Sequence, residues 1–225
     1  MKIKGCYHIM VYKLSFFFFT TCVIALIERY IPFIFGKIST VNILHHLITT
    51  ISAHYFLFKY PGILFHVYDY KQQDISPYFL YVPIITCSFA FYELYGNAFL
   101  KRNIDYFIHG MMMVFVSVLF LNYENFHWTY PALLMETSSI FLNLMKLDNK
   151  IYKYLFGVTF VFYRNLLFPY ISFVFYDENF LKIISYSPYY PHEKGIGCLL
   201  LVINTLNFYW GYKIIEKFLK TIKNE

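Results

Sequence analysis

The sequence predicts an all-α membrane protein, a polytopic helix bundle with about seven transmembrane helices. Hydrophobic residues make up 59% of the 225 residues and charged residues only 14%. No soluble domain of this length needs that much apolar surface. The apolar residues also form continuous runs and lack the alternation that is typical of a membrane β-barrel. Composition and patterning therefore both favour membrane helices.

Seven apolar segments are long enough to cross a hydrocarbon layer of about 30 Å. They are Leu14 to Phe33, Ile38 to Phe58, Tyr78 to Leu100, Ile104 to Leu121, His127 to Met145, Tyr154 to Tyr176 and Gly195 to Ile215. The first segment follows a basic start, as the core of a signal peptide would, but Glu28-Arg29 and Pro32 favour an ordinary, uncleaved helix end. The segment from Asp177 to Lys194 is expected to be an interfacial lid or an ordinary loop. Lys146 to Lys150 is one of several short polar joints.

Basic residues are unevenly divided between the two ends of these helices. With seven spans, the N-terminus and the even-numbered loops hold seven Lys and Arg, and the odd-numbered loops and the C-terminal tail hold eleven, with Arg164 left out. Cytoplasmic segments carry the excess. The C-terminus is therefore expected in the cytosol and the N-terminus on the lumenal side. Helix ends and lipid head groups account for the net charge of +6, so no nucleic-acid partner is expected.

Asp105 and His109 interrupt the apolar run from Ile104 to Leu121. A spacing of four residues puts both side chains on one face of a helix. An ionisable residue at membrane depth is costly unless it faces the protein interior, so it indicates a functional site by default. Asp105 is also close enough to Lys101-Arg102 to be a helix-end counter-charge. His109 lies one turn deeper, where that alternative does not apply.

Other predicted helices carry polar residues that could line a cavity. These candidates are Glu93, Asn97, Glu136, Ser139, Asn143, Arg164, Asn165, Asn204, Asn207, His45 and His46. Glu136, Ser139 and Asn143 share a helical face, which makes their helix the best indication of a lined cavity. Arg164 is the expected ion-pair partner of Glu136 or Glu93. Hydrogen bonds between helices are the alternative role, above all for the histidines.

The cysteines and glycines indicate no metal site and no cofactor. Cys6, Cys22, Cys87 and Cys198 are scattered and form no C-x-x-C pair, so neither a metal site nor a disulfide framework is expected. The last three lie in apolar runs and are expected to be buried thiols. No Gly-rich phosphate-binding loop is present.

Three stretches carry a family resemblance: Phe89 to Gly110, Tyr130 to Leu147 and Leu206 to Lys220. In their order and spacing they resemble the TLC-domain family, the membrane family that includes ceramide synthases and the translocating-chain-associating membrane protein. FAFYELYGNAFLKRNIDYFIHG (Phe89 to Gly110) is similar to its aromatic-acidic helix followed by a D-x3-H helix. YPALLMETSSIFLNLMKL (Tyr130 to Leu147) is similar to its E-x-S-x2-F-x-N helix. LNFYWGYKIIEKFLK (Leu206 to Lys220) resembles its closing N-x2-W helix and basic tail.

The resemblance implies a domain organisation. Residues 39–220 would form a six-helix membrane domain, a TLC-type barrel around a cavity. Residues 1–38 would form an N-terminal region with the first helix, and residues 221–225 the cytosolic tail end.

Departures from the ceramide synthases place the chain nearer the non-synthase branches. The resemblance implies a double histidine in the fourth helix, but here Gly110 follows His109. The acid-rich D-x2-D element of those enzymes is replaced by the simpler Glu136 stretch. His45-His46-Leu47-Ile48-Thr49 matches their H-H-x2-T motif but lies two helices too early, so we interpret it as coincidental or compensatory.

Three functions stay open at this point. The first is a lipid-handling protein, linked to sphingolipids and lipid homeostasis, whose cavity accepts a lipid or fatty-acyl chain in the endoplasmic reticulum. The second is an N-acyltransferase that uses acyl-CoA as a substrate, with His109 as nucleophile or general base and Asp105 orienting it. The third is a transporter or channel, although no repeated half with broken helices is visible. The sequence names no protein partner.

Overall fold

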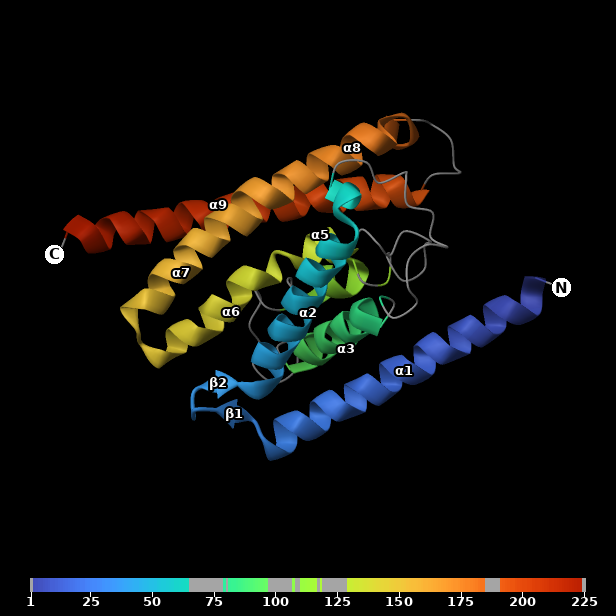
Figure 1. Cartoon of the computed structure of the whole chain (residues 1–225), viewed down its shortest axis with the longest axis horizontal. Helices are drawn as coiled ribbons and strands as arrows, with labels where there is room; N and C mark the ends of the chain where they lie inside the picture. The colour runs from blue at the N-terminus through green and yellow to red at the C-terminus, as the bar shows by residue number, and fades with distance from the viewer. Residues whose placement is uncertain are drawn as a thin grey trace. The chain divides into compact units, whose positions relative to one another are not determined.

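In the residues that it describes, the computed structural model of the chain is helical almost throughout, which confirms the all-α class (Figure 1). It describes residues 2–64, 79, 81–96, 107, 110–116, 118, 129–184 and 191–223. The chain forms two compact units, Met1–Ile48 with Gln72–Thr129 and Thr49–Lys71 with Tyr130–Glu225. The helix α2 (Thr40–Lys59) contributes to both.

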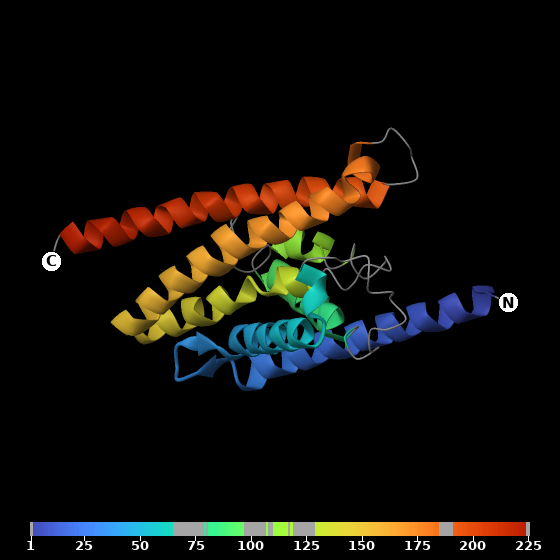
Figure 2. The ribbon, with the colours of Figure 1, turned by 45° about the horizontal axis from the view of Figure 1, so that its top comes forward.

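In the first unit, α1 (Lys2–Tyr30) and α3 (Tyr81–Tyr95) lie side by side (Figures 1 and 2). Their contact is aromatic at one end, where the rings of Phe16 and Tyr81 are 4.9 Å apart. It is polar further along, where the hydroxyls of Thr20 and Ser88 form a buried hydrogen bond of 2.5 Å. An aromatic contact and a buried pair of hydroxyls therefore hold the long first helix against α3.

A short hairpin joins α1 to α2. Its strands are β1 (Phe33–Ile34) and β2 (Ile38–Ser39), which pair antiparallel. The prediction that the first helix extends to Phe33 is therefore wrong, since α1 ends at Tyr30. Pro32 explains the difference, because a proline disfavours helical geometry in the residue before it. Ser39 then caps α2, and its hydroxyl accepts a hydrogen bond of 3.3 Å from the Asn42 N–H.

Apart from the described helical residues 110–116 of the first unit and Thr129 at the start of α5, the remaining described helices belong to the second unit. These are η1 (Pro61–Leu64), α5 (Thr129–Leu133), α6 (Glu136–Leu144), η7 (Met145–Leu147), α7 (Lys150–Phe160), the π-helical η8 (Val161–Leu167), α8 (Phe168–Ile184) and α9 (Pro191–Lys223). α7, η8 and α8 form one continuous helical rod, and α9 runs alongside it (Figure 2). The fully buried rings of Phe56 and Tyr130 stack 4.2 Å apart and attach α2 to α5.

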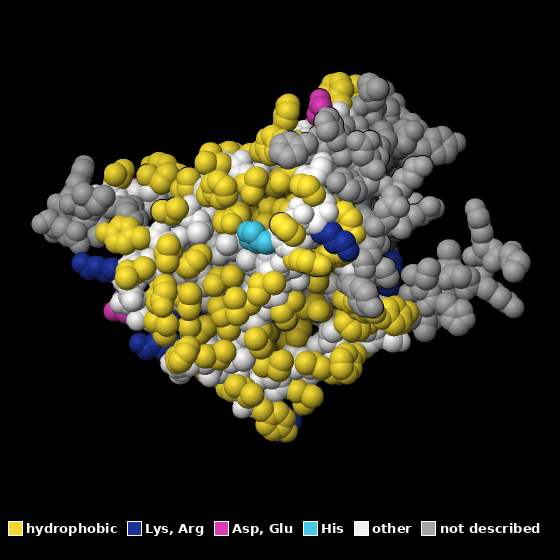
Figure 3. Space-filling model, viewed as in Figure 1, with side chains coloured by type: hydrophobic (Ala, Val, Ile, Leu, Met, Phe, Trp, Pro, Cys, Tyr) yellow, Lys and Arg dark blue, Asp and Glu magenta, His cyan; other side chains and the backbone are white. Residues whose placement is uncertain are grey.

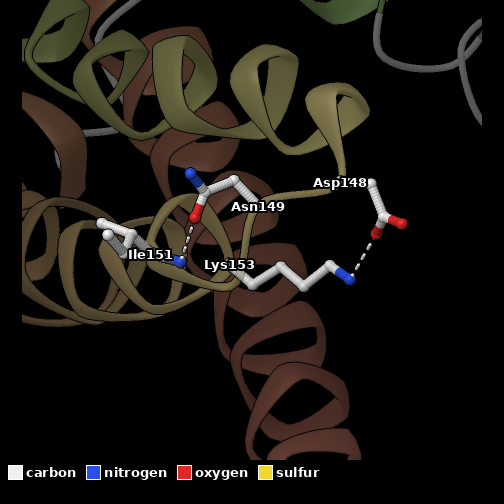
Figure 4. Close-up of polar contacts among 4 residues, drawn as sticks. All are labelled: Asp148, Asn149, Ile151 and Lys153. Atoms are coloured by element: carbon white, nitrogen blue, oxygen red, sulfur yellow. Dashed lines mark hydrogen bonds and ion pairs between the residues drawn. The ribbon is translucent and has the colours of Figure 1, made fainter.

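The polar joint predicted from Lys146 to Lys150 is a tight turn that starts α7 (Figure 4). Asp148 has a left-handed backbone with φ of 54°, which reverses the chain. The Asn149 side chain accepts a hydrogen bond of 2.8 Å from the Ile151 N–H and so caps the helix. Lys153 forms an exposed ion pair of 2.9 Å with Asp148.

Several predicted helix bounds are wrong. The fifth predicted helix is broken at Leu134 and Met135, where the backbone N–H groups bond three residues back instead of four. The segment from Asp177 to Lys194 is no simple loop, because α8 continues to Ile184 and α9 begins at Pro191. An apolar run predicts only the part of a helix that lies in the hydrocarbon layer. The helix itself can continue into the polar residues on either side of that run.

Two helices of the described residues are long and apolar enough to cross a membrane, Lys150–Asp177 and Lys194–Lys217. In α2, three histidines lower the mean hydropathy. The predicted span from Ile104 to Leu121 lies mostly outside the described residues.

Large apolar side chains such as Val158 and Phe173 are about two-thirds exposed, at 68% and 65%. Figure 3 shows apolar side chains across the visible surface.

The cysteines only partly follow their predicted burial. Cys87 is buried, but Cys22 and Cys198 are exposed. An apolar helix in a membrane protein has an outward face as well as an inward one, and a thiol is small and apolar enough for either. Hydrophobicity of the surrounding run therefore did not predict which face these thiols occupy.

Candidate functional site

A buried polar face on α6 begins the candidate site in the second unit. Glu136, Ser139 and Asn143 are 4%, 7% and 5% exposed, and Ser138 is fully buried beside them. Their spacings of three and four residues place them on one side of the helix. The amide of Asn143 donates a hydrogen bond of 2.9 Å to the Ser139 carbonyl, one turn back. A carboxylate, two hydroxyls and an amide are thus held together away from solvent.

Arg164 of η8 reaches this face. Its Nε donates a hydrogen bond of 2.8 Å to the Ser138 hydroxyl, and its Nη2 donates one of 2.9 Å to the Ser139 hydroxyl. The negative charge of Glu136 also acts on the guanidinium. The guanidinium carbon also lies 5.4 Å from the centre of the Phe160 ring. We call Glu136, Ser138, Ser139, Asn143 and Arg164 the arginine cluster.

A local change of helix type lies at Arg164. In the π-helical η8 the Phe168 N–H bonds to the Tyr163 carbonyl, five residues back. Pro169 follows and has no N–H, so it cannot donate to the Asn165 carbonyl, as the helix would otherwise require. Pro169 thus accounts for the widened turn. Such π-helical turns often occur at functional sites, since they re-aim the side chains that they carry.

A second polar row connects the α8 side of the rod to α9. The amide of Asn204 donates a hydrogen bond of 2.9 Å to the Ser172 hydroxyl. The amide of Asn165 donates one of 3.4 Å to the Asn207 carbonyl. Asn165 lies directly on Gly211, where an added Cβ would be 3.0 Å from its Cγ and nearer still to its Nδ2. The missing side chain of Gly211 therefore makes room for the Asn165 amide.

The candidate histidines His45 and His46 belong to the first unit. The ring of His45 stacks on Phe89 with centroids 3.8 Å apart and an angle of 6° between the planes. His46 meets the same ring edge-on at 6.0 Å. His45 is only 4% exposed, and His46 is half-buried. Phe89 thus positions both imidazoles where α2 meets α3.

For the other candidate residues the structure gives little or no information on a role. Asp105, His109 and Asn97 lie outside the described residues, so their roles stay predictions. Glu93 lies half-buried on α3 in the first unit. Among the residues that the structure does describe, no group of three His, Cys, Asp or Glu could hold a metal ion.

Gly110, which follows His109, packs against the backbone of α3. A Cβ at this position would lie 3.3 Å from both Cα and Cβ of Leu94, and 3.4 Å from its nitrogen. Small residues permit such close approach of helix backbones in membranes. A second histidine at this position would therefore require α3 to move.

We expect Gly110→Ala to lower the free energy of unfolding by about 1–3 kcal/mol, the usual effect of overpacking. Gly110→His should be worse, because its ring adds further atoms beside the same backbone. Thermal melting of the detergent-solubilised protein measures both. Gly96→Ala is the matched control, since nothing lies within 4 Å of its added Cβ. A Gly110→His protein as stable as the parent would show that the site tolerates a double histidine.

Ser172 and Tyr163 take part in hydrogen bonds of the structure although they were not among the predicted site residues. Ser172 lies seven residues after Asn165, two helical turns further along the same side, so its spacing could have identified it. Tyr163 bonds to His54 at 3.1 Å. In a chain with 24 Tyr, nothing in the local sequence distinguishes this one.

These features define an integral membrane protein whose apolar helices bury polar side chains between them. The family model of the TLC domain matches residues 36–216, and the chain belongs to the TLC-domain family. The matched range begins after α1, which ends at Tyr30. No curated protein and no solved structure matches the chain.

Proposed function

We propose that the protein handles lipids or fatty-acyl chains in a polar-lined cavity of its TLC domain. The observation that supports this most is the burial of Arg164 at the middle of Lys150–Asp177, a helix able to cross a membrane. A charged residue at this depth is costly and marks a functional site by default. The arginine cluster combines a cation, a carboxylate, hydroxyls and an amide. These groups can hold the polar end of a lipid while its chains lie along apolar helix faces.

The remaining candidates extend this proposal. Asp105 and His109 would lie near the polar end of the cavity, and the His45–His46 pair would contribute from α2. A link to sphingolipids and lipid homeostasis, and residence in the endoplasmic reticulum, follow from the resemblance to the TLC-domain family and are part of the proposal. Catalysis is not required for it.

The enzyme alternative receives less support from the geometry. An acyltransferase of the ceramide-synthase type would be expected to carry a second histidine after His109. Gly110 occupies that position, with the Leu94 backbone 3.3 Å from where its Cβ would be. Only this acyltransferase hypothesis requires acyl-CoA as a substrate. Only it makes His109 and Asp105 catalytic residues. A proton path for a transporter would use Glu93, Asp105, His109 and Glu136, and no observation favours it.

His109→Asn tests the proposal. Asn keeps a hydrogen-bond donor and an acceptor but carries no proton at neutral pH. We expect expression and thermal stability to stay near those of the parent, while the lipid composition of the cells becomes that of cells lacking the protein. Lipidomic comparison of the three strains measures this. His127→Asn is the control, because His127 is not a site candidate. An unchanged lipid composition in a well-expressed His109→Asn strain would contradict a functional role for His109.

A second assay separates lipid handling from catalysis. Membranes are incubated with labelled acyl-CoA and sphinganine, with His109→Ala membranes as the background. Labelled ceramide above that background would establish the enzyme alternative. Its absence, together with an altered lipid composition, is the result that lipid handling without catalysis predicts.

We also propose that seven helices cross the membrane, six of them around the cavity, with the C-terminal tail in the cytosol. The basis is the distribution of seven against eleven basic residues. Protease added to sealed microsomes should therefore remove a C-terminal tag and spare an N-terminal one. A C-terminal tag that survives until detergent opens the vesicles would mean that the topology is inverted or the span count wrong.

A further inference from the structure

His54 of α2 and Tyr163 of η8 form a polar pair within the second unit. The His54 Nε2 and the Tyr163 hydroxyl oxygen are 3.1 Å apart, and the rings meet edge-on with centroids 5.9 Å apart. The other ring nitrogen, Nδ1, lies 2.8 Å from the Thr50 carbonyl oxygen. His54 is nevertheless an exposed residue. The pair is thus an ordered hydrogen-bonded group on the surface of its unit.

The two contacts determine which atoms donate. A carbonyl oxygen can only accept, so the Nδ1 of His54 carries the hydrogen. In the neutral imidazole Nε2 is then an acceptor, and the Tyr163 hydroxyl must donate to it. This uses the one hydrogen of the phenol and leaves its oxygen with a lone pair. With the imidazole neutral, the pair therefore presents the Tyr163 oxygen as a hydrogen-bond acceptor to whatever lies against it.

The residues around this pair are apolar and exposed. On α2, one turn to either side of His54, Ile51 is 64% and Phe58 is 85% exposed. On η8, beside and below Tyr163, Phe162 is 51% and Leu166 is 61% exposed. In membrane proteins ionisable residues almost always face the interior, so an exposed histidine–tyrosine pair in apolar surroundings is a candidate site for a polar group from outside the protein.

We propose that the His54–Tyr163 pair binds a neutral membrane lipid that carries a free hydroxyl group. The lipid hydroxyl donates to the Tyr163 oxygen, and the lipid chains lie along Ile51, Phe58, Phe162 and Leu166. The choice of a lipid as ligand rests on the proposed function. The chemistry favours a hydroxyl over a phosphate, because a phosphate diester has no hydrogen to donate to the phenol oxygen. The nearby cation, Lys59, contacts the next residue in the chain: its Nζ lies 5.5 Å from the centre of the Tyr60 ring.

The experiment uses the full chain in nanodiscs of phosphatidylcholine, whose head group has no hydrogen-bond donor. The probe is a photoactivatable, alkyne-bearing diacylglycerol with its hydroxyl free, and its acetylated analogue is the matched control probe. We expect the free probe to label residues within 51–58 or 161–167. Acetylation, or the change Tyr163→Phe, should reduce labelling about fivefold, the factor that corresponds to a hydrogen bond of about 1 kcal/mol. Tyr170→Phe removes an exposed hydroxyl of α8 and should leave labelling unchanged.

Equal labelling by the free and the acetylated probe would overturn the inference, and so would adducts that map elsewhere. Both results come from the parent protein, so they hold even if Tyr163→Phe folds poorly. Failure of the proposed function looks different. If His109→Asn leaves the lipid composition unchanged while the free probe still labels this pair in a Tyr163-dependent way, the lipid site stands and the cavity proposal fails.

Discussion

Replacing Arg164 by leucine is expected to lower the folded yield strongly, because it leaves Glu136 as a buried charge without its cation. Breaking a buried charge pair by removing one partner typically costs about 3–5 kcal/mol. The same change also removes the donors that Ser138 and Ser139 accept from at 2.8 and 2.9 Å. Glu136→Leu alone should be destabilising for the converse reason, since the guanidinium stays buried with less compensation.

The double variant Glu136→Leu with Arg164→Leu should recover part of the loss, because two apolar residues can replace a buried pair with little change. Folded yield after size-exclusion chromatography and thermal melting measure all three variants. Lys153→Ala is the matched control, since its ion pair with Asp148 is exposed and such pairs contribute about 0–1 kcal/mol. A double variant as poor as the sum of the single ones would show that Glu136 and Arg164 do not stabilise each other.

Gly211→Ala is expected to destabilise the contact between α9 and the rod. Its Cβ would lie 3.0 Å from the Cγ of Asn165, so the amide must swing away and give up its hydrogen bond to the Asn207 carbonyl. Overpacking of this kind costs about 1–3 kcal/mol. Gly195→Ala on the same helix is the control, because its added Cβ meets nothing within 4 Å. That change should be neutral or slightly stabilising, since alanine favours helix.

Removing the Asn165 side chain tests whether its contact with the new Cβ at position 211 causes the loss of stability. In an Asn165→Ala background the space above Gly211 is empty, so Gly211→Ala should cost much less than it does in the parent. Thermal melting of the four proteins gives the coupling between the two positions. An equal loss of stability in both backgrounds would mean that Asn165 is not what restricts position 211.

Local patterns in the sequence predicted much of the α6 helix and its flanking turn. A helical period places Glu136, Ser139 and Asn143 on one face whatever the rest of the chain does. The joint from Lys146 to Lys150 was predicted from its polar residues, and in the structure the Asn149 side chain caps α7 there. The expected interdependence of Glu136 and Arg164 also came from the sequence, as a charge at membrane depth needs compensation.

Other features depend on contacts between segments far apart in the chain. Ser138 and Ser139 accept from Arg164 across 25 or more residues, and a hydroxyl next to a carboxylate does not show where its donor lies. From the sequence alone, a chemical role of His45 and His46 could not be distinguished from a role in helix packing. The stacking of His45 on Phe89 and the edge-on contact of His46 with the same ring, more than 40 residues away, became evident only from the packing of α2 against α3.

The sequence by itself therefore determined the class of protein, an all-α membrane protein of the TLC-domain family, and the polar faces of single helices. These follow from composition and from a period of 3.6 residues, which are local properties of the chain. Only the tertiary structure decided which hydroxyls Arg164 binds, why Gly211 has no side chain and which tyrosine faces His54. Each of these depends on the distance between two helix surfaces, and helices can pack at many separations and angles that their own sequences allow equally.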